Sequence, residues 1–120
     1  MSYQYSFEKL EVWIDARFFV KEIYSVTKSF PKEESYILCS QMQRAAISIS
    51  SNIAEGVSRI SKREKIRFLE IAYGSLMEVY SQMHLALDLN YMGNSTFESL
   101  KLTVYKISNK LNALMRSFNN

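Results

Sequence analysis

Seven apolar residues near the end of the chain follow one another in alternating steps of three and four. They are Phe97, Leu100, Val104, Ile107, Leu111, Leu114 and Phe118. This spacing keeps a row of side chains on one side of an α-helix, and it is typical of knobs-into-holes packing between helices. It predicts an amphipathic helix over about residues 96–118 that packs within a bundle.

Three further segments have helical periodicity, over about residues 9–28, 33–56 and 61–90. The buried faces expected for them are Leu10, Trp13, Ala16, Val20, Tyr24 and Thr27 in the first, Leu38, Met42, Ala45, Ile49 and Ile53 in the second, and Leu69, Ala72, Leu76, Val79, Met83 and Ala86 in the third. The 120 residues include only 3 Gly and 1 Pro, whereas an all-β fold needs frequent turn residues. The length suits one domain, residues 1–120, with one core.

Start and stop signals separate the four segments. Phe30-Pro31 ends the first helix, because the residue before proline disfavours helical geometry, and Gly56 is expected to end the second in a left-handed conformation. The expected helix starts are the acidic pair Glu33 and Glu34 and two capping boxes, Ser61 with Glu64 and Ser95 with Glu98. The short connections make consecutive helices antiparallel, so the sequence predicts an all-α, antiparallel up-down four-helix bundle.

The sequence contains no recognisable catalytic or metal-binding pattern. A di-metal site in a bundle needs paired Glu-x-x-His motifs, but His84 is the only histidine and no acid lies three residues before it. The lone Cys39 beside Leu38 is typical of a small buried side chain, and it cannot form an internal disulfide, which fits a reducing cytoplasm. No apolar run approaches the roughly 20 residues that span a bilayer. We therefore expect no catalytic residue, no metal, no cofactor, no membrane segment and no enzyme activity.

A row of polar residues accompanies the apolar face of the second segment. Its members are Gln41, Arg44, Ser48, Asn52 and Glu55, and they follow steps of three, four, four and three. One interpretation is an ordinary solvated flank. The other is a contact with another helix or subunit, since the small neighbours Ala45 and Ala46 would let a second backbone approach. Glu78 on the third helix is then a candidate partner for Arg44.

The third segment begins with a run of basic residues. Residues 58–67 read SRISKREKIR, and the positive side chains are Arg59, Lys62, Arg63, Lys65 and Arg67. Positive charges in a first helical turn oppose the helix dipole, so a phosphate backbone is one candidate for compensating them. A solubilising helix start is the alternative. No aromatic residue is interleaved in this run, so we expect salt-sensitive contact with a nucleic-acid backbone rather than sequence-specific reading of a single strand.

The chain carries more aromatic side chains than a bundle of this size encloses easily. It has eight Tyr, seven Phe and one Trp. Phe18 and Phe19 are adjacent and point in different directions, and Tyr73, Tyr80 and Tyr105 lie off the expected core rows. Such residues are typical of subunit interfaces, although scattered exposure is the alternative.

One combination of residues resembles a known family. It runs from Gln41 and Arg44-Ala45-Ala46 through Ser48-Ile49 to Asn52-Ile53-Ala54-Glu55-Gly56, and it extends to Leu10, Val12-Trp13, Ala16, Tyr24, Thr27, Phe30-Pro31, Glu34, Arg59, Ser61, Glu64, Phe68-Leu69, Ala72, Gly74-Ser75 and Glu78. These residues resemble the four-helix-bundle family of proteins encoded in 23S ribosomal-RNA intervening sequences. The last helix matches only in its apolar pattern.

The resemblance implies an up-down bundle that assembles as a homopentamer around a central channel. It also implies similarity to the accessory variability protein of diversity-generating retroelements, a pentamer that binds nucleic acid and a reverse transcriptase. Relatives often carry paired arginines where this chain has Gln43 and then Arg44. Two functional hypotheses follow: a homo-oligomeric accessory protein that binds RNA or DNA through its basic run, and a scaffold whose partner is another protein.

Overall fold

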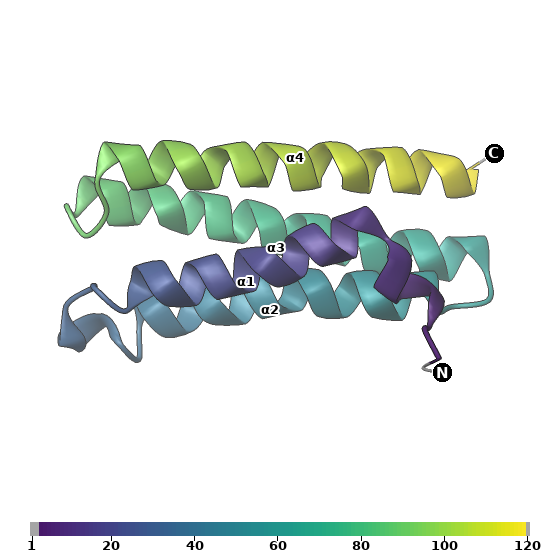
Figure 1. Cartoon of the computed structure of the whole chain (residues 1–120), viewed down its shortest axis with the longest axis horizontal. Coiled ribbons are helices and arrows are strands. Elements are labelled where there is room, and N and C mark those ends of the chain that lie inside the picture. The colour runs from purple at the N-terminus through teal and green to yellow at the C-terminus, as the bar shows by residue number, and fades with distance from the viewer. Residues whose placement is uncertain (1–2, 120) are drawn as a thin grey trace.

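The computed structural model describes residues 3–119, and its regular structure over that range is entirely helical (Figure 1). Four α-helices make up most of it: α1 (Glu11–Thr27), α2 (Leu38–Val57), α3 (Lys62–Asp88) and α4 (Asn94–Asn119). Two short 3₁₀-helices, Ser6–Lys9 and Lys32–Glu34, precede α1 and α2. The predicted all-α class is confirmed.

Each helix packs against the next along the chain, and α1 also packs against α4, which closes the bundle (Figure 1). The helices alternate in direction, so the described parts of both termini lie at the end of the bundle that also carries the α2–α3 loop. We call this the basic end, because its α2–α3 loop and the start of α3 carry Arg59, Lys62, Arg63, Lys65 and Arg67. The predicted antiparallel up-down arrangement is therefore correct.

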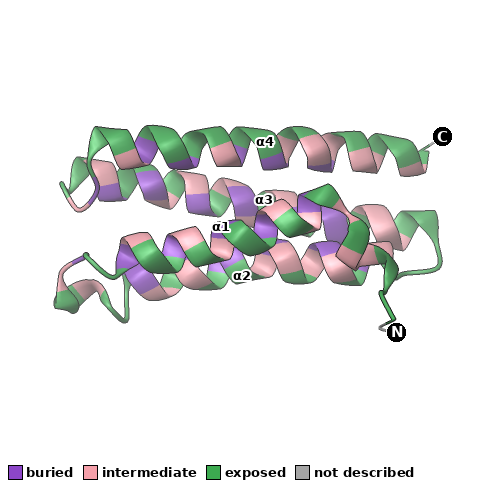
Figure 2. Cartoon of the chain, viewed as in Figure 1, coloured by how far each residue is buried: buried purple, intermediate pink, exposed green. Residues whose placement is uncertain are grey.

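The core lies along the centre of the bundle, where the buried faces of the four helices meet (Figure 2). Every residue predicted for the buried faces of α2 and α3 is buried, as are the first five predicted for α4. Leu114 and Phe118 are half-buried, because they lie in the last turns of α4, where the bundle ends. Strict spacing of large aliphatic side chains thus identified three of the four faces.

The buried face of α1 differs from the one expected. Tyr24 is 41% exposed and Trp13 and Val20 are half-buried, while the fully enclosed side chains include Phe19 and Ile23. Two apolar rows overlap on this helix, and the row that enters the core is Val12, Ala16, Phe19, Ile23 and Thr27. Phe18 is 60% exposed, which confirms that the two adjacent phenylalanines point in different directions.

The second helix begins at Leu38 rather than near Glu33, so that predicted boundary was wrong. Residues before it form the Lys32–Glu34 3₁₀-turn, and Ile37 has non-helical backbone angles. Glu34 does not cap α2. Its carboxylate accepts a hydrogen bond of 2.8 Å from the hydroxyl of Tyr91 in the α3–α4 connection. The segment before α2 is thus tied to the α3–α4 connection rather than forming the first turns of the helix.

The capping predictions had mixed outcomes. The Ser61 hydroxyl accepts a 3.1 Å hydrogen bond from the backbone N–H of Glu64, which is one half of the first capping box, while the Glu64 carboxylate pairs with Arg67. Ser95 is the second residue of α4 and lies inside the helix, because α4 already begins at Asn94. The left-handed helix end occurs at Asn90, with a φ of 63°, where the N–H of Tyr91 donates to the carbonyl of Ala86.

Gly56 has a different role from the predicted one. Its φ is not positive, and it lies within α2, where it is buried against α3. A Cβ at this position would lie 2.9 Å from the Cβ of Phe68 and 3.2 Å from the carbonyl oxygen of Lys65. Glycine is needed here because the two helix backbones approach closely, not because the chain turns.

We predict opposite effects for alanine at two helical glycines. Gly56→Ala should lower the free energy of unfolding by about 1–3 kcal/mol, because the new methyl group overpacks the α2–α3 contact. Gly74→Ala, in α3, meets no atom within 4 Å and should raise stability by about 0.5–1 kcal/mol through helix propensity. Urea unfolding measures both. A Gly56→Ala protein as stable as the parent would contradict the close-approach explanation.

Candidate functional site

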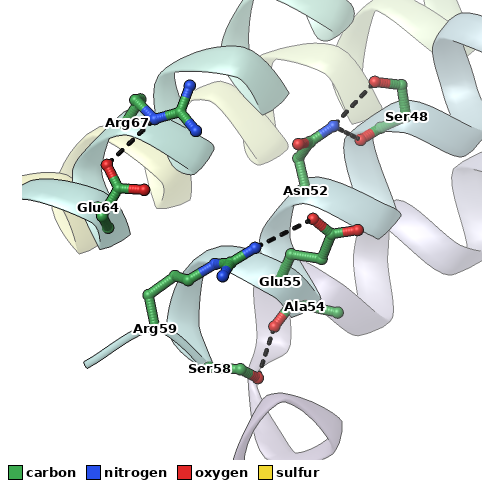
Figure 3. A network of polar contacts seen from close by, with 8 residues as sticks. All are labelled: Ser48, Asn52, Ala54, Glu55, Ser58, Arg59, Glu64 and Arg67. Atoms are coloured by element: carbon green, nitrogen blue, oxygen red, sulfur yellow. Dashed lines mark hydrogen bonds and ion pairs between the residues drawn. The ribbon is translucent and has the colours of Figure 1, made fainter. Parts of the chain in front are cut away.

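The basic run predicted from the sequence gathers at the basic end of the bundle. Arg59 lies in the α2–α3 loop, and Lys62, Arg63, Lys65 and Arg67 lie in the first turns of α3. The Ser61 cap fixes where α3 begins, and the Ser58 hydroxyl donates a 2.8 Å hydrogen bond to the carbonyl of Ala54 at the end of α2 (Figure 3). The loop that presents these charges is thus anchored at both sides.

Two of the arginines enclose an aromatic ring. The guanidinium carbons of Arg59 and Arg67 lie 4.5 and 4.9 Å from the ring centroid of Phe68. Arg59 also lies 3.9 Å from the carboxylate of Glu55, and the Nε of Arg67 donates to Glu64 at 3.2 Å (Figure 3). All four charged side chains are at least 40% exposed, so these ion pairs are weak and can be exchanged for other partners.

Lys65 lies on the inner side of this cluster. Its ammonium group donates a 2.9 Å hydrogen bond to the carbonyl of Val57, the last residue of α2, and lies 5.4 Å from the ring centroid of Phe118 in α4. The last carbonyl groups of a helix lack partners within the helix and carry partial negative charge. Lys65 therefore joins the ends of α2 and α4 to the start of α3 and is occupied within the subunit.

A groove of about 520 Å³ lies between the start of α3 and the end of α4. Its walls include Lys62, Arg63, Arg67, the apolar Ile66 and Phe118, and one acid, Glu70. The basic run in the sequence contains no interleaved aromatic residue. The fold, however, brings Phe118 of α4 into the same groove as three of the five predicted basic residues. Sequence spacing gave no signal for this neighbour.

We predict that substitutions of Lys65 and Arg63 have different effects on the free energy of unfolding, because only Lys65 makes contacts that stabilise the subunit. Lys65→Met keeps the aliphatic contact but removes the hydrogen bond to Val57, so stability should fall by about 1 kcal/mol. Arg63 is exposed and forms no ion pair within residues 3–119, so Arg63→Met should leave stability unchanged or raise it by up to about 1 kcal/mol, because it removes a cation that opposes the helix dipole. Equal stability of the two variants in chemical denaturation would contradict the assigned role of Lys65.

The polar row of α2 lies along its border with α3. The Ser48 and Ser75 hydroxyls are 2.8 Å apart across the two helices, and the Asn52 amide donates to the hydroxyl and carbonyl of Ser48 (Figure 3). Ser48 and Asn52 are half-buried, whereas Gln41, Arg44 and Glu55 are exposed. The row is thus partly a helix–helix contact inside the subunit and partly surface.

The suggested pair between Arg44 and Glu78 does not form within one subunit. Glu78 accepts a 3.3 Å hydrogen bond from Gln82, and Arg44 has no hydrogen bond or ion pair among residues 3–119. The other amide atom of Gln82, Oε1, is buried without a partner in the described part of the chain. Arg44 and Gln82 therefore each keep a hydrogen-bonding group without a partner among residues 3–119.

Apolar residues continue both polar rows toward the end of the bundle opposite the basic end. Ile37 precedes Gln41 by four residues and is 64% exposed, while Leu85 and Leu89 follow Gln82 at steps of three and four and are 51% and 52% exposed. On α3 the whole row is Ile71, Ser75, Glu78, Gln82, Leu85 and Leu89. This α2–α3 face, defined by Ile37, Gln41, Arg44 and Ser48 together with the α3 row, was only half recognised from the sequence. The same step counting on α3 would have found the rest.

The remaining candidate groups form no reactive cluster. His84 is exposed and packs against the rings of Tyr80 and Phe97, with centroids 4.8 and 4.9 Å away. Cys39 is buried, its thiol lies 3.6 Å from the carbonyl oxygen of Thr27, and burial raises its pKa. Over residues 3–119 there is no group of three or more His, Cys, Asp or Glu side chains placed to hold a metal ion. None of the helices in that range has the length and apolar character needed to cross a bilayer.

The described chain is thus an antiparallel four-helix bundle in which the α2–α3 loop and the start of α3 carry five of the 15 basic residues of the sequence. A family model described as the 23S rRNA-intervening sequence protein matches residues 8–113, and the chain belongs to this family. The resemblance inferred from the sequence is confirmed.

A solved structure supports the fold. It is the crystal structure of a protein of unknown function from the S23 ribosomal protein family from Bacteroides thetaiotaomicron, with a TM-score of 0.80 and 22% sequence identity. The similarity covers 87% of this chain and 97% of the other. At this identity the similarity concerns the fold alone. No curated protein is significantly similar to the chain.

Proposed function

We propose that this protein is a non-enzymatic, cytoplasmic homo-oligomer that binds nucleic acid through its basic end. The observation that supports binding most directly is the groove between α3 and α4, where Lys62, Arg63 and Arg67 face one acid, Glu70. Phosphate groups supply the negative charge that such a surface attracts, and helix N-termini favour anions. The family resemblance adds the expectation of a pentamer.

Multiplicity makes a small basic surface useful. One subunit offers only a few cations, and part of their charge is balanced by Glu55 and Glu64. In a ring, each subunit repeats the same surface, so one long nucleic acid can contact several of them. The effective concentration of linked contacts can raise the overall affinity by about 10²–10⁴. Binding of this kind follows the phosphate backbone and weakens as salt rises.

We predict that replacing Arg59, Lys62 and Arg63 by Ser abolishes or strongly weakens binding to RNA and DNA in a low-salt mobility-shift assay. The control variant replaces Lys28, Lys32 and Lys101 by Ser and removes the same charge; these exposed lysines lie just after α1, in the turn before α2 and near the start of α4. The control variant should retain most of the affinity, because it loses the same net charge as the first variant while its basic end is unchanged. No binding by the parent protein, or equal loss in both variants, would refute the assigned surface.

The α2–α3 face is the proposed subunit interface. It combines exposed Ile37, Leu85 and Leu89 with the exposed Arg44, which has no hydrogen bond or ion pair among residues 3–119. Exposed apolar surface mixed with unsatisfied hydrogen-bonding groups is what a partner covers to advantage. Arg44 of one subunit would then reach an acid such as Glu78 on its neighbour.

We predict that the native particle has several times the 14.0 kDa mass of one chain, and five times that mass if the ring is a pentamer. Leu85→Glu should shift it toward monomers, because the new carboxylate would be desolvated in the interface. Leu102→Glu, at an apolar position on α4 that is 72% exposed, is the control and should leave the mass unchanged. Light scattering measures all three. A monomeric parent protein would refute the assembly.

A second candidate function is a scaffold for another protein, without a role for nucleic acid. The observation in its favour is that four large apolar or aromatic side chains toward one end of α2 and α3 are more than half exposed, namely Tyr36, Ile37, Leu85 and Leu89. The mobility-shift and light-scattering experiments separate the two functions. An assembled or monomeric protein that binds no nucleic acid at low salt favours the scaffold.

A further inference from the structure

The groove at the basic end contains more than positive charge. Its lining includes the half-buried apolar side chains of Ile66 and Phe118 beside Lys62, Arg63 and Arg67. A surface that only attracted phosphates would need no apolar lining. We propose that this groove binds single-stranded nucleic acid, with phosphates against the three cations and a base packed on Phe118. This inference rests on the proposed nucleic-acid function and specifies the form of its ligand.

The combination of groups distinguishes a single strand from a duplex. In a duplex the bases are stacked on one another, and the outer surface presents phosphates. A duplex would therefore make no apolar contact with Ile66 and Phe118. In a single strand the base faces are free to stack on aromatic side chains while the backbone follows a line of cations. Phe118 and the three cations line the same groove of about 520 Å³, which meets both requirements at one place.

The side chains around the groove are positioned for exchange of partners. Arg63 has no ion pair within residues 3–119, and Arg67 pairs only with Glu64 while remaining 57% exposed. Lys65 holds the end of α4 near the start of α3 through its contact with the Phe118 ring. A phosphate can therefore replace Glu64 as the partner of Arg67 at low cost, while Lys65 holds the Phe118 ring in place.

The test compares ligands on the unaltered protein by fluorescence anisotropy at low salt. The probes are a labelled RNA strand of about 12 nucleotides, the matching duplex, and an abasic DNA strand with its base-containing counterpart. Stacking contributes about 1–3 kcal/mol per base, so the base-containing single strands should bind about 5–100-fold more tightly than the duplex or the abasic strand. The abasic comparison needs no variant and is unaffected by any change in folding.

Two substitutions then locate the contact. Phe118→Leu keeps an apolar side chain and should reduce single-strand affinity about 5–100-fold while leaving duplex affinity unchanged. Tyr105→Leu, an aromatic position on α4 that is 66% exposed and lies outside the groove, should change neither. Arg63→Gln should weaken both ligands, because it removes a phosphate contact.

The outcomes separate this inference from the proposed function. Equal affinity for single strand, duplex and abasic strand, or an unchanged affinity in Phe118→Leu, overturns the single-strand assignment while salt-dependent binding at the basic end stands. No binding of any nucleic-acid probe overturns both. Competition by polyglutamate as strong as that of the unlabelled RNA also overturns the single-strand assignment, since it shows that charge alone is recognised.

Discussion

The close approach of α2 and α3 at Gly56 determines the geometry of the basic end. With no side chain at this position, the Cβ of Phe68 and the backbone of Lys65 lie directly against α2. Lys65 is consequently within reach of the Val57 carbonyl, and the Phe68 ring lies where Arg59 and Arg67 can pack on it. The charges of the loop are arranged around an uncharged helix contact, because that contact fixes where α3 begins relative to the end of α2.

The same helix pair also organises the other surface. Along α2 and α3 the contact passes from Gly56 through the hydroxyl pair of Ser48 and Ser75 to the exposed Ile37 and Leu85. Small and polar groups let the two helices approach closely at Gly56 and at the Ser48–Ser75 pair. One pair of helices therefore presents basic residues at one end and exposed apolar residues at the other, so the proposed assembly and the proposed ligand binding would use separate surfaces.

The sequence predicted the bundle because large aliphatic residues recur at helical spacing in three helices, where a single apolar row leaves no choice of face. It failed in α1, where the overlapping rows through Val20 and Phe19 differ by one position. It also failed where distant segments meet. The Tyr91 hydroxyl donates to Glu34 in the turn before α2, the Cβ of Phe68 leaves no room for a side chain at Gly56, and Phe118 lines the basic groove. Periodicity reports which face of a helix is buried, but not which residue of another helix lies opposite.

The positive charges at the start of α3 oppose its helix dipole, and nearby groups compensate these charges to different degrees. Lys65 is compensated within the subunit, because the antiparallel α2 ends beside it and offers the carbonyl of its last residue, where the dipole is negative. Glu64 lies in the same first turn and supports the dipole. Arg63 has no such compensation among the described residues, and each exposed cation in a first turn costs about 0.3–1 kcal/mol. Under the proposed function, a phosphate bound in the adjoining groove would recover part of that energy, because it would bring negative charge to the start of α3.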